Sequence, residues 1–221
     1  YIGGRYSVLS EVGMLPAQLL GLHDAKFKRF NNLIKNKSYL NSLISNVSFI
    51  FKCVSQGKKN SVILNYDESS ENLFKWYQQL TAESLGKKNK GVFPIISSMP
   101  KDNHSLLQLY LDGPKNSFFT FFGVINEKTN KLDNSNLFGK FSNLKNKSLS
   151  QILQAQRHAT QIVFRKNKIP LIMEIVNPIK TPYQFLPLQR FFGRYIFRPI
   201  CFVFPAENVF GRQQLWSTFL D

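Results

Sequence analysis

Short apolar runs alternate along the chain with longer stretches that carry a helical period. The run Ser61 to Tyr66 is bounded by charged residues, as expected of a strand that is buried on both faces. Ser117 to Ile125 and Ile169 to Val176 are predicted to be two further strands. Strands that alternate with helices indicate the α/β class, here a doubly wound, mainly parallel sheet flanked by helices.

Helical stretches lie before and between these strands. From Glu71 to about Leu85 the apolar positions share one face, Ser70 precedes the first turn as a cap, and Gly86 follows the last turn as a stop. Three more helices are predicted at Lys26 to Gln56 with Ser38 as a possible start, at Asn103 to Asp112, and at Leu149 to about Lys166.

The composition of the chain changes near Pro182. Every lysine lies at or before Lys180, whereas residues 183–221 are rich in Arg, Phe, Gln and Pro. Two interpretations of this tail stay open: a sequence translated out of frame, or an amphipathic element whose arginines contact anionic lipid. We therefore expect a domain over residues 1–182 and an atypical tail over 183–221. Within the domain, Thr129 to Lys147 is polar and is predicted to be a surface loop.

Charge indicates an anionic partner without identifying it. The chain has 29 Lys and Arg against 13 Asp and Glu, a net charge of +16, with a pI of about 9.9. Such a balance suits a nucleic acid, an acidic lipid surface or a phosphorylated small molecule equally well.

Several classes of function lack their signatures. Cys53 and Cys201 form no CxxC pair, which argues against a disulfide framework or a zinc knuckle and favours a reducing cytoplasm. The three histidines form no HExxH motif, and no GxGxxG or Walker motif is present, so neither a metal nor a nucleotide cofactor is expected. No uncharged apolar run reaches the ~18 residues needed to span a bilayer. Because the first residue is Tyr1, we do not expect it to be a natural start.

Three short segments carry candidate chemistry. In the first, Gly4 lets the backbone approach a ligand and Arg5 supplies a fixed cation. In the second, Gln79 and Glu83 are four residues apart and so share one face at the end of a helix, where Glu83 could act as a general base. In the third, His104 would lie in the first turn of a helix and could move a proton to or from a sugar oxygen. Each segment alone has a structural interpretation that is at least as good.

The third segment also contains a candidate helix cap. Asp102 precedes the apolar pattern of the helix, and an Asp at that position can accept a hydrogen bond from the first-turn amides. His23 and His158 have no comparable setting and are assigned no function.

Taken in order, the three segments resemble the glucose-6-phosphate isomerase family. The similarity rests on Gly3-Gly4-Arg5-Tyr6-Ser7-Val8, on Glu83-Ser84-x-Gly86-Lys87, and on Asp102-x-His104-Ser105 followed by Gln108-Leu109-Tyr110. It extends from Tyr1 to about Pro182. The resemblance implies the second sugar-isomerase (SIS) domain of such an enzyme, a three-layer α/β/α unit. The first domain, which supplies most contacts to the substrate phosphate in the family, would be absent.

The resemblance also implies a role for each matching residue. Glu83 matches the base that moves a proton between C2 and C1 of the sugar through a cis-enediolate. Arg5, with the Gly4 backbone, matches the group that neutralises the enediolate charge, and Gln79 matches a substrate contact. His104 matches the residue that assists ring opening and that, in the family, reaches in from the neighbouring subunit. A cytoplasmic, homodimeric, cofactor-free enzyme of glycolysis and gluconeogenesis is implied.

Some positions depart from the family pattern. Glu11 and Asn103 replace residues that are usual there, and Val209 to Gln213 is followed by no counterpart of the family's ring-opening lysine. We therefore expect the 221-residue chain to isomerise little. Two alternatives remain: a non-catalytic SIS module that binds a sugar phosphate, and a basic nucleic-acid-binding protein. Scattered lysines without interleaved aromatic residues make the second alternative the weaker one.

Overall fold

The computed structural model describes residues 7, 10–22, 35–124, 144 and 146–176. Gly4, Arg5 and the tail 183–221 lie outside the described residues, as does nearly all of the predicted surface loop at 129–147. What the sequence predicts for these segments stays a prediction.

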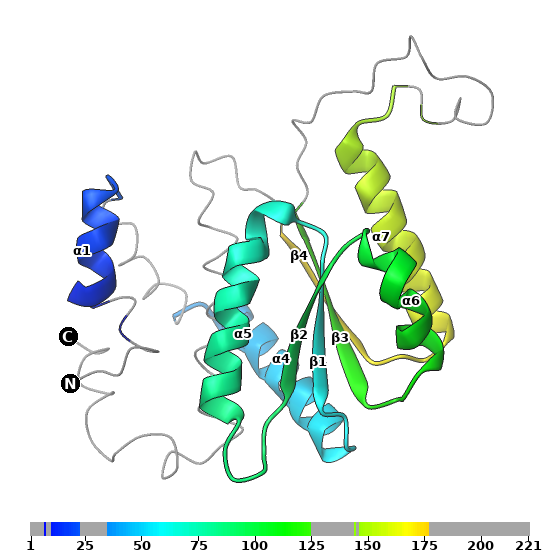
Figure 1. Ribbon diagram of the computed structural model, residues 1–221, viewed down its shortest axis with the longest axis horizontal. Helices are drawn as coiled ribbons and strands as arrows, with labels where there is room; N and C mark the ends of the chain where they lie inside the picture. The colour runs from blue at the N-terminus through cyan, green and yellow to red at the C-terminus, as the bar shows by residue number, and fades with distance from the viewer. Residues whose placement is uncertain (1–6, 8–9, 23–34, 125–143, 145, 177–221) are drawn as a thin grey trace.

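The centre of the fold is a four-stranded parallel sheet with the strand order β2-β1-β3-β4 (Figure 1). Its register sets Asn60 opposite Phe93 on one side and opposite Ser117 on the other. The predicted α/β class with a parallel sheet is therefore confirmed, and the three predicted strands are found within two residues of their expected bounds. The strands are β1 (Asn60–Asn65), β2 (Phe93–Ser98), β3 (Ser117–Val124) and β4 (Leu171–Val176).

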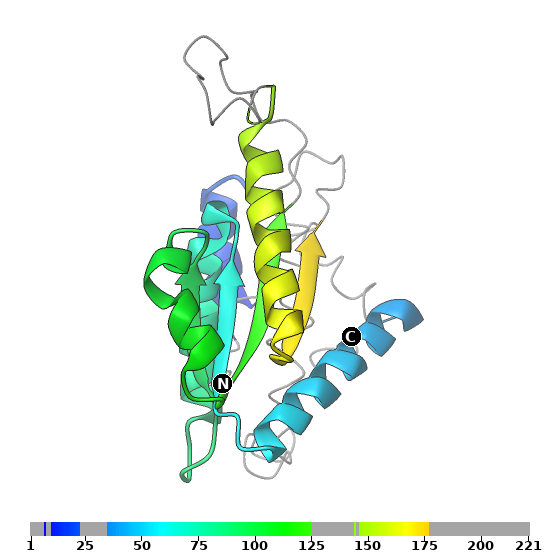
Figure 2. The same ribbon diagram turned by 90° about the vertical axis from the view of Figure 1, so that its right-hand side faces the viewer.

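Helices cover both faces of the sheet, as a doubly wound fold requires (Figures 1 and 2). The chain runs from β1 through α5 to β2, and then through α6 back across β1 to β3. Side chains of α4 and α5 pack in the apolar cluster on one face, and side chains of α6 and α7 pack in the cluster on the other. The helices are α1 (Glu11–Leu19), α4 (Lys37–Ser55), α5 (Glu71–Leu85), α6 (Asp102–Asp112) and α7 (Leu149–Lys166), with a short 3₁₀ turn, η2 (Glu68–Ser70), before α5.

Alternate phenylalanines of β3 join the two layers. Phe119 and Phe121 contact Phe164 of α7 edge to face, at ring-centre distances of 4.9 and 5.3 Å. Phe122 points to the opposite face and meets Phe74 of α5 in the same way at 4.9 Å. The period of two residues in a strand places these rings on opposite faces, so β3 is buried from both sides and fixes the spacing of the helical layers.

Two helix starts differ from the predictions. The helix predicted over Lys26 to Gln56 begins at Lys37 among the described residues, and its N-cap is Asn36, whose Oδ1 accepts a hydrogen bond from the Tyr39 amide at 3.1 Å. Ser38 is therefore not the cap. Ser70 does stand at the N-cap of α5, but its hydroxyl donates to the carboxylate of Asp67 and makes no capping bond. Asn36 therefore holds the place predicted for Ser38, and the Ser70 side chain bonds to the preceding turn instead of the first turn of α5.

One strand and one α-helix were not predicted from the sequence. Strand β2 lies at the edge of the sheet, begins with the exposed Phe93 and contains Pro94, which an edge strand tolerates. Helix α1 contains Pro16 and exposes several apolar side chains. No helix among the described residues is long and apolar enough to cross a membrane.

Candidate functional site

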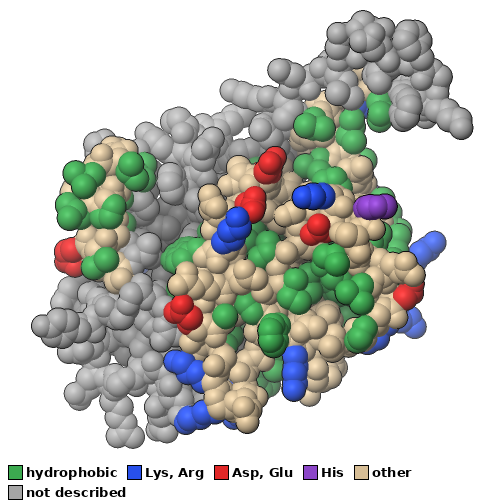
Figure 3. Space-filling view, viewed as in Figure 1, with side chains coloured by type: hydrophobic (Ala, Val, Ile, Leu, Met, Phe, Trp, Pro, Cys, Tyr) green, Lys and Arg blue, Asp and Glu red, His purple; other side chains and the backbone are tan. Residues whose placement is uncertain are grey.

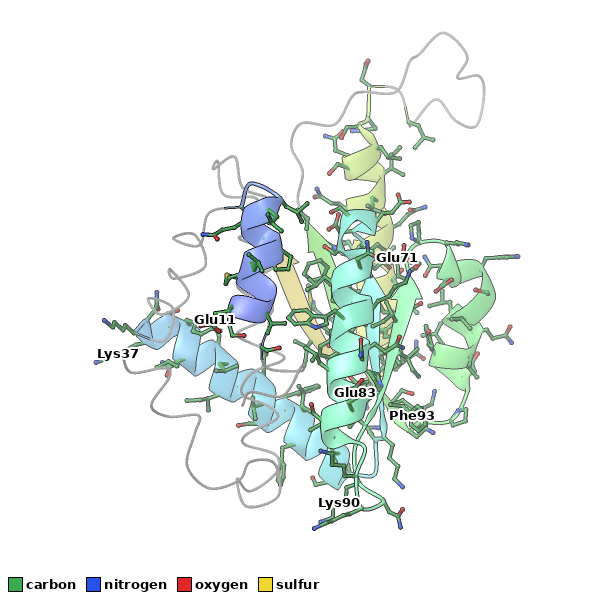
Figure 4. The ribbon with its side chains drawn as sticks, turned by 60° about the vertical axis from the view of Figure 1, so that its left-hand side comes forward. Glu11, Lys37, Glu71, Glu83, Lys90 and Phe93 are labelled. Atoms are coloured by element: carbon green, nitrogen blue, oxygen red, sulfur yellow. The ribbon has the colours of Figure 1, made fainter. Side chains whose placement is uncertain are left out.

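Glu83 and Gln79 lie side by side on the exposed face of the last turns of α5. The Gln79 Nε2 donates a hydrogen bond to the Glu83 Oε1 at 2.9 Å, and both side chains are exposed. The shared face predicted from their spacing is therefore confirmed. Figure 4 shows Glu83 near the end of the helix and Glu71 at the opposite end. The hydrogen bond restricts the carboxylate of Glu83, which a positioned base requires.

The opposite face of α5 fixes this pair to the sheet. Tyr77, Leu80 and Ser84 are buried, and the Gln78 Nε2 donates to the carbonyl of Pro94 in β2 at 2.7 Å. Because buried apolar contacts and a strand carbonyl hold the helix, the backbone that carries Glu83 has a defined position above the beginning of β2.

A tight, positively charged turn follows Glu83 and leads into β2. The Lys90 amide donates to the Lys87 carbonyl at 2.9 Å, and Lys88 adopts a left-handed backbone with φ of 52°. All three lysines are exposed, and Figure 3 shows positive side chains at the lower end of the molecule, where this turn lies. Exposed cations therefore follow the helix that carries Glu83, and such a turn attracts anionic ligands to this end of the molecule.

Gly91 closes this turn and has no room for a side chain. Its φ is +126°, and a Cβ would lie 2.7 Å from the Leu85 carbonyl oxygen. We expect Gly91→Ala to lower the free energy of unfolding by about 1–3 kcal/mol through backbone strain and overpacking, as measured by urea denaturation.

The control for this substitution is Gly57→Ala. Gly57 also has a positive φ, +81°, but nothing lies within 4 Å of the position of its Cβ. The control keeps the conformational cost and removes the clash, so it should destabilise the protein less than Gly91→Ala. If both substitutions lowered the free energy of unfolding equally, the clash with the Leu85 carbonyl oxygen would not contribute to the loss.

His104 lies in the first turn of α6, as predicted, and its side chain is exposed. The role predicted for Asp102 is wrong, because Lys101 occupies the N-cap and Asp102 is the first helical residue. The Asp102 Oδ2 instead accepts hydrogen bonds from the Ser97 hydroxyl at 2.9 Å and from the Ser98 amide at 2.8 Å. The carboxylate thus ties the end of β2 to the turn that presents His104.

Glu83 and His104 lie at opposite ends of the parallel sheet. Helix α5 returns the chain to the beginning of β2, whereas α6 starts after the end of β2. The beginning and the end of the six-residue strand β2 are roughly 20 Å apart, so one copy of the chain does not bring these side chains together. Gly4 and Arg5 are outside the described residues, and their predicted approach to Glu83 is not tested.

The described residues contain no group of three or more His, Cys, Asp or Glu side chains that could hold a metal ion. The site that they do form consists of the carboxylate of Glu83, the amide of Gln79 and the neighbouring lysine turn.

Comparison with known proteins supports the resemblance seen in the three motifs. The chain is 35% identical over 184 residues to the glucose-6-phosphate isomerase of Methanocaldococcus jannaschii, a match that covers 80% of this chain and 45% of that protein. It is 32% identical to a probable glucose-6-phosphate isomerase of Haloquadratum walsbyi, covering 80% and 42%, and 29% identical to that of Clostridium tetani, covering 87% and 44%. The predicted resemblance to glucose-6-phosphate isomerase is confirmed.

The chain spans less than half the length of these relatives. No protein-family model matches it. A solved structure, that of a hypothetical protein from Thermus thermophilus, superimposes with a TM-score of 0.67 over 86% of this chain and 47% of that one, at 24% identity. This likeness supports the fold alone.

Proposed function

We propose that residues 1–182 form the second SIS domain of a glucose-6-phosphate isomerase and supply the base that interconverts glucose 6-phosphate and fructose 6-phosphate in the cytoplasm, in glycolysis and gluconeogenesis. The observation that carries the proposal is the Gln79–Glu83 pair, which lies exposed on a helix that is fixed to the sheet. The match to the named isomerases supports it.

The proposed reaction needs only proton transfers. The Glu83 carboxylate removes the proton from C2 of the open-chain sugar and returns it to C1 through a cis-enediolate, and the hydroxyl proton passes from O2 to O1 in the same interconversion. Gln79 holds the Glu83 Oε1 and so restricts the rotation of the carboxylate that takes the proton. The enediolate is an anion, and a fixed guanidinium such as that of Arg5 would stabilise its charge. The lysine turn would attract the phosphorylated substrate toward this end of the molecule.

The second proton-transfer group is proposed to come from another copy. His104 lies at the other end of the sheet from Glu83 in its own chain, so a site that uses both residues has to combine two subunits. A symmetric dimer would then form two such sites, each with Glu83 of one subunit and His104 of the other.

Activity of a complete protein tests the proposal. Residues 1–182 would replace the matching segment of the Methanocaldococcus jannaschii relative, and the fusion would be incubated with fructose 6-phosphate in D₂O. We expect proton NMR to show glucose 6-phosphate with deuterium at C2. A fusion that folds by circular dichroism and binds the sugar phosphate without converting it would favour the non-catalytic SIS module instead.

A further inference from the structure

The carboxyl ends of β1 and β3 lie far from Glu83 and contain a group of buried polar side chains. The strand order reverses between these two strands, and this is the place where doubly wound sheets commonly bind ligands. Tyr66 follows β1, and Gly123 lies next to the last residue of β3. A side chain at Gly123 would collide with the guanidinium of Arg157 from α7. The guanidinium can therefore pack against the strand only because this residue is a glycine.

Arg157 is buried, and among the described residues its charge has no partner. The side chain is 7% exposed, and its Nε has no hydrogen-bond partner. No carboxylate of the described residues forms an ion pair with it. Burial lowers the pKa of Arg157, and Tyr66 opposes this shift. A buried charge is normally paired, because leaving one unpaired costs several kcal/mol.

Other unpaired polar atoms accompany this guanidinium. The Tyr66 hydroxyl is buried, lies near Asn103 and Thr160, and has no partner of normal hydrogen-bond geometry. The Asn103 Oδ1 is also unpaired, and rotation of its amide would present an NH₂ group in its place. Gln161, one helical turn beyond Arg157, has an unpaired Nε2. Most of these groups can donate a hydrogen bond, so together they suit an acceptor that carries negative charge.

The nearest acidic residue in the sequence does not supply that charge. Asp67 follows Tyr66 directly, but its carboxylate accepts hydrogen bonds from Ser69, at 2.9 and 2.8 Å, and from Ser70. Both serines belong to the turn before α5, and α5 packs on the other face of the sheet from Arg157.

We propose that this switch point is a phosphate-binding site, in which the Nε of Arg157 and the hydroxyl of Tyr66 donate to a phosphate oxygen. The ligand is inorganic phosphate or the phosphate group of a small metabolite. The site is distinct from Glu83, which lies at the amino ends of the strands, and it lies at the same end of the sheet as His104, the direct neighbour of Asn103. A guanidinium edge suits phosphate because it presents parallel N–H groups to two oxygens.

The test is an NMR titration of the full chain with inorganic phosphate, with chloride as the counter-titration at equal ionic strength. The arginine Nε–H signals are observed, and the signal that disappears in Arg157→Gln is assigned to Arg157. We expect this signal to shift with a Kd of roughly 1–10 mM. Titration with glucose 6-phosphate then distinguishes a metabolite phosphate from the free ion, since only a metabolite site binds the ester more tightly than phosphate.

Matched variants separate this site from general attraction to a basic protein. Arg157→Gln should weaken phosphate binding by about tenfold or more, since a hydrogen bond to a charged group contributes about 1.5–3 kcal/mol. Arg165→Gln, which changes an exposed arginine two turns along the same helix, should leave the Kd unchanged. If Arg157→Gln does not fold, Gly123→Ala tests the same contact, because it displaces the guanidinium and retains the charge.

Two results would overturn the proposal. One is a wild-type chain whose Arg157 signal does not shift with phosphate beyond its response to chloride. The other is an Arg157→Gln or Gly123→Ala protein that is folded and binds phosphate as the wild type does. Neither result bears on the isomerase proposal, which rests on Glu83.

Discussion

Glu83→Gln in the fusion protein is expected to lower kcat by about 10²- to 10⁴-fold, the usual contribution of a general base. The substitution keeps the size of the side chain and removes the atom that accepts the proton. Because Gln79 and Glu83 are both exposed, neither the core nor the anchoring of α5 changes, and KM should change little. Initial rates over a range of fructose 6-phosphate concentrations measure both constants.

Glu71→Gln is the matched control for this prediction. Glu71 lies at the other end of the same helix (Figure 4) and pairs with Lys75 at 2.8 Å on the surface. Removing its charge loses only a solvent-screened pair on the helix surface and should leave kcat as it is. If Glu83→Gln keeps more than about a tenth of the wild-type kcat, Glu83 is not the base.

Local patterns in the sequence predict much of this fold, because in most elements the residue propensities agree with the structure that forms. The helix α7 is found at its predicted bounds, 149–166, where Ser148 and Gln151 form a reciprocal capping box. The strand β1 is a short apolar run because it is buried in every direction. It pairs with β2 and β3 at its two edges, and helices cover both of its faces. In such segments propensity, burial and capping all favour the same structure.

The candidate site was predictable to the extent that its geometry is helical. A spacing of four residues places Gln79 beside Glu83 in any α-helix, and the structure shows the resulting hydrogen bond. The bond from Asp102 to Ser97 and Ser98 was not predictable in the same way, because it depends on how the chain turns after an edge strand that has little pattern of its own.

Contacts between remote segments left no signal in the sequence. Arg157 reads as one more basic residue on a helix, and Tyr66 as the end of an apolar run. They come close enough to influence each other because β1 and β3 are neighbours in the sheet and because Gly123 leaves room for the guanidinium. Charge composition records the number of cations but does not show that one of them is buried.

A mixture of two inactive variants is expected to recover activity if His104 acts across a dimer interface. Glu83→Gln and His104→Asn fusions would each be inactive or nearly so. In a dimer that contains one of each, one site combines both substitutions and the other combines Glu83 of one subunit with His104 of its partner. Random exchange of subunits would therefore restore about a quarter of the wild-type sites, because half of the dimers are mixed and each mixed dimer has one intact site.

The observed separation within one chain makes this result specific. Because the two side chains lie at opposite ends of the sheet, a site within a single subunit would need a rearrangement of α5 and α6, and mixing two such variants would restore nothing. Coupled-enzyme rates measured before and after subunit exchange, with mixed dimers quantified by native mass spectrometry, distinguish the two cases. Mixed dimers that form in the expected proportion and stay inactive would show that His104 does not complete a partner's site, while the case for Glu83 would still rest on its own substitution.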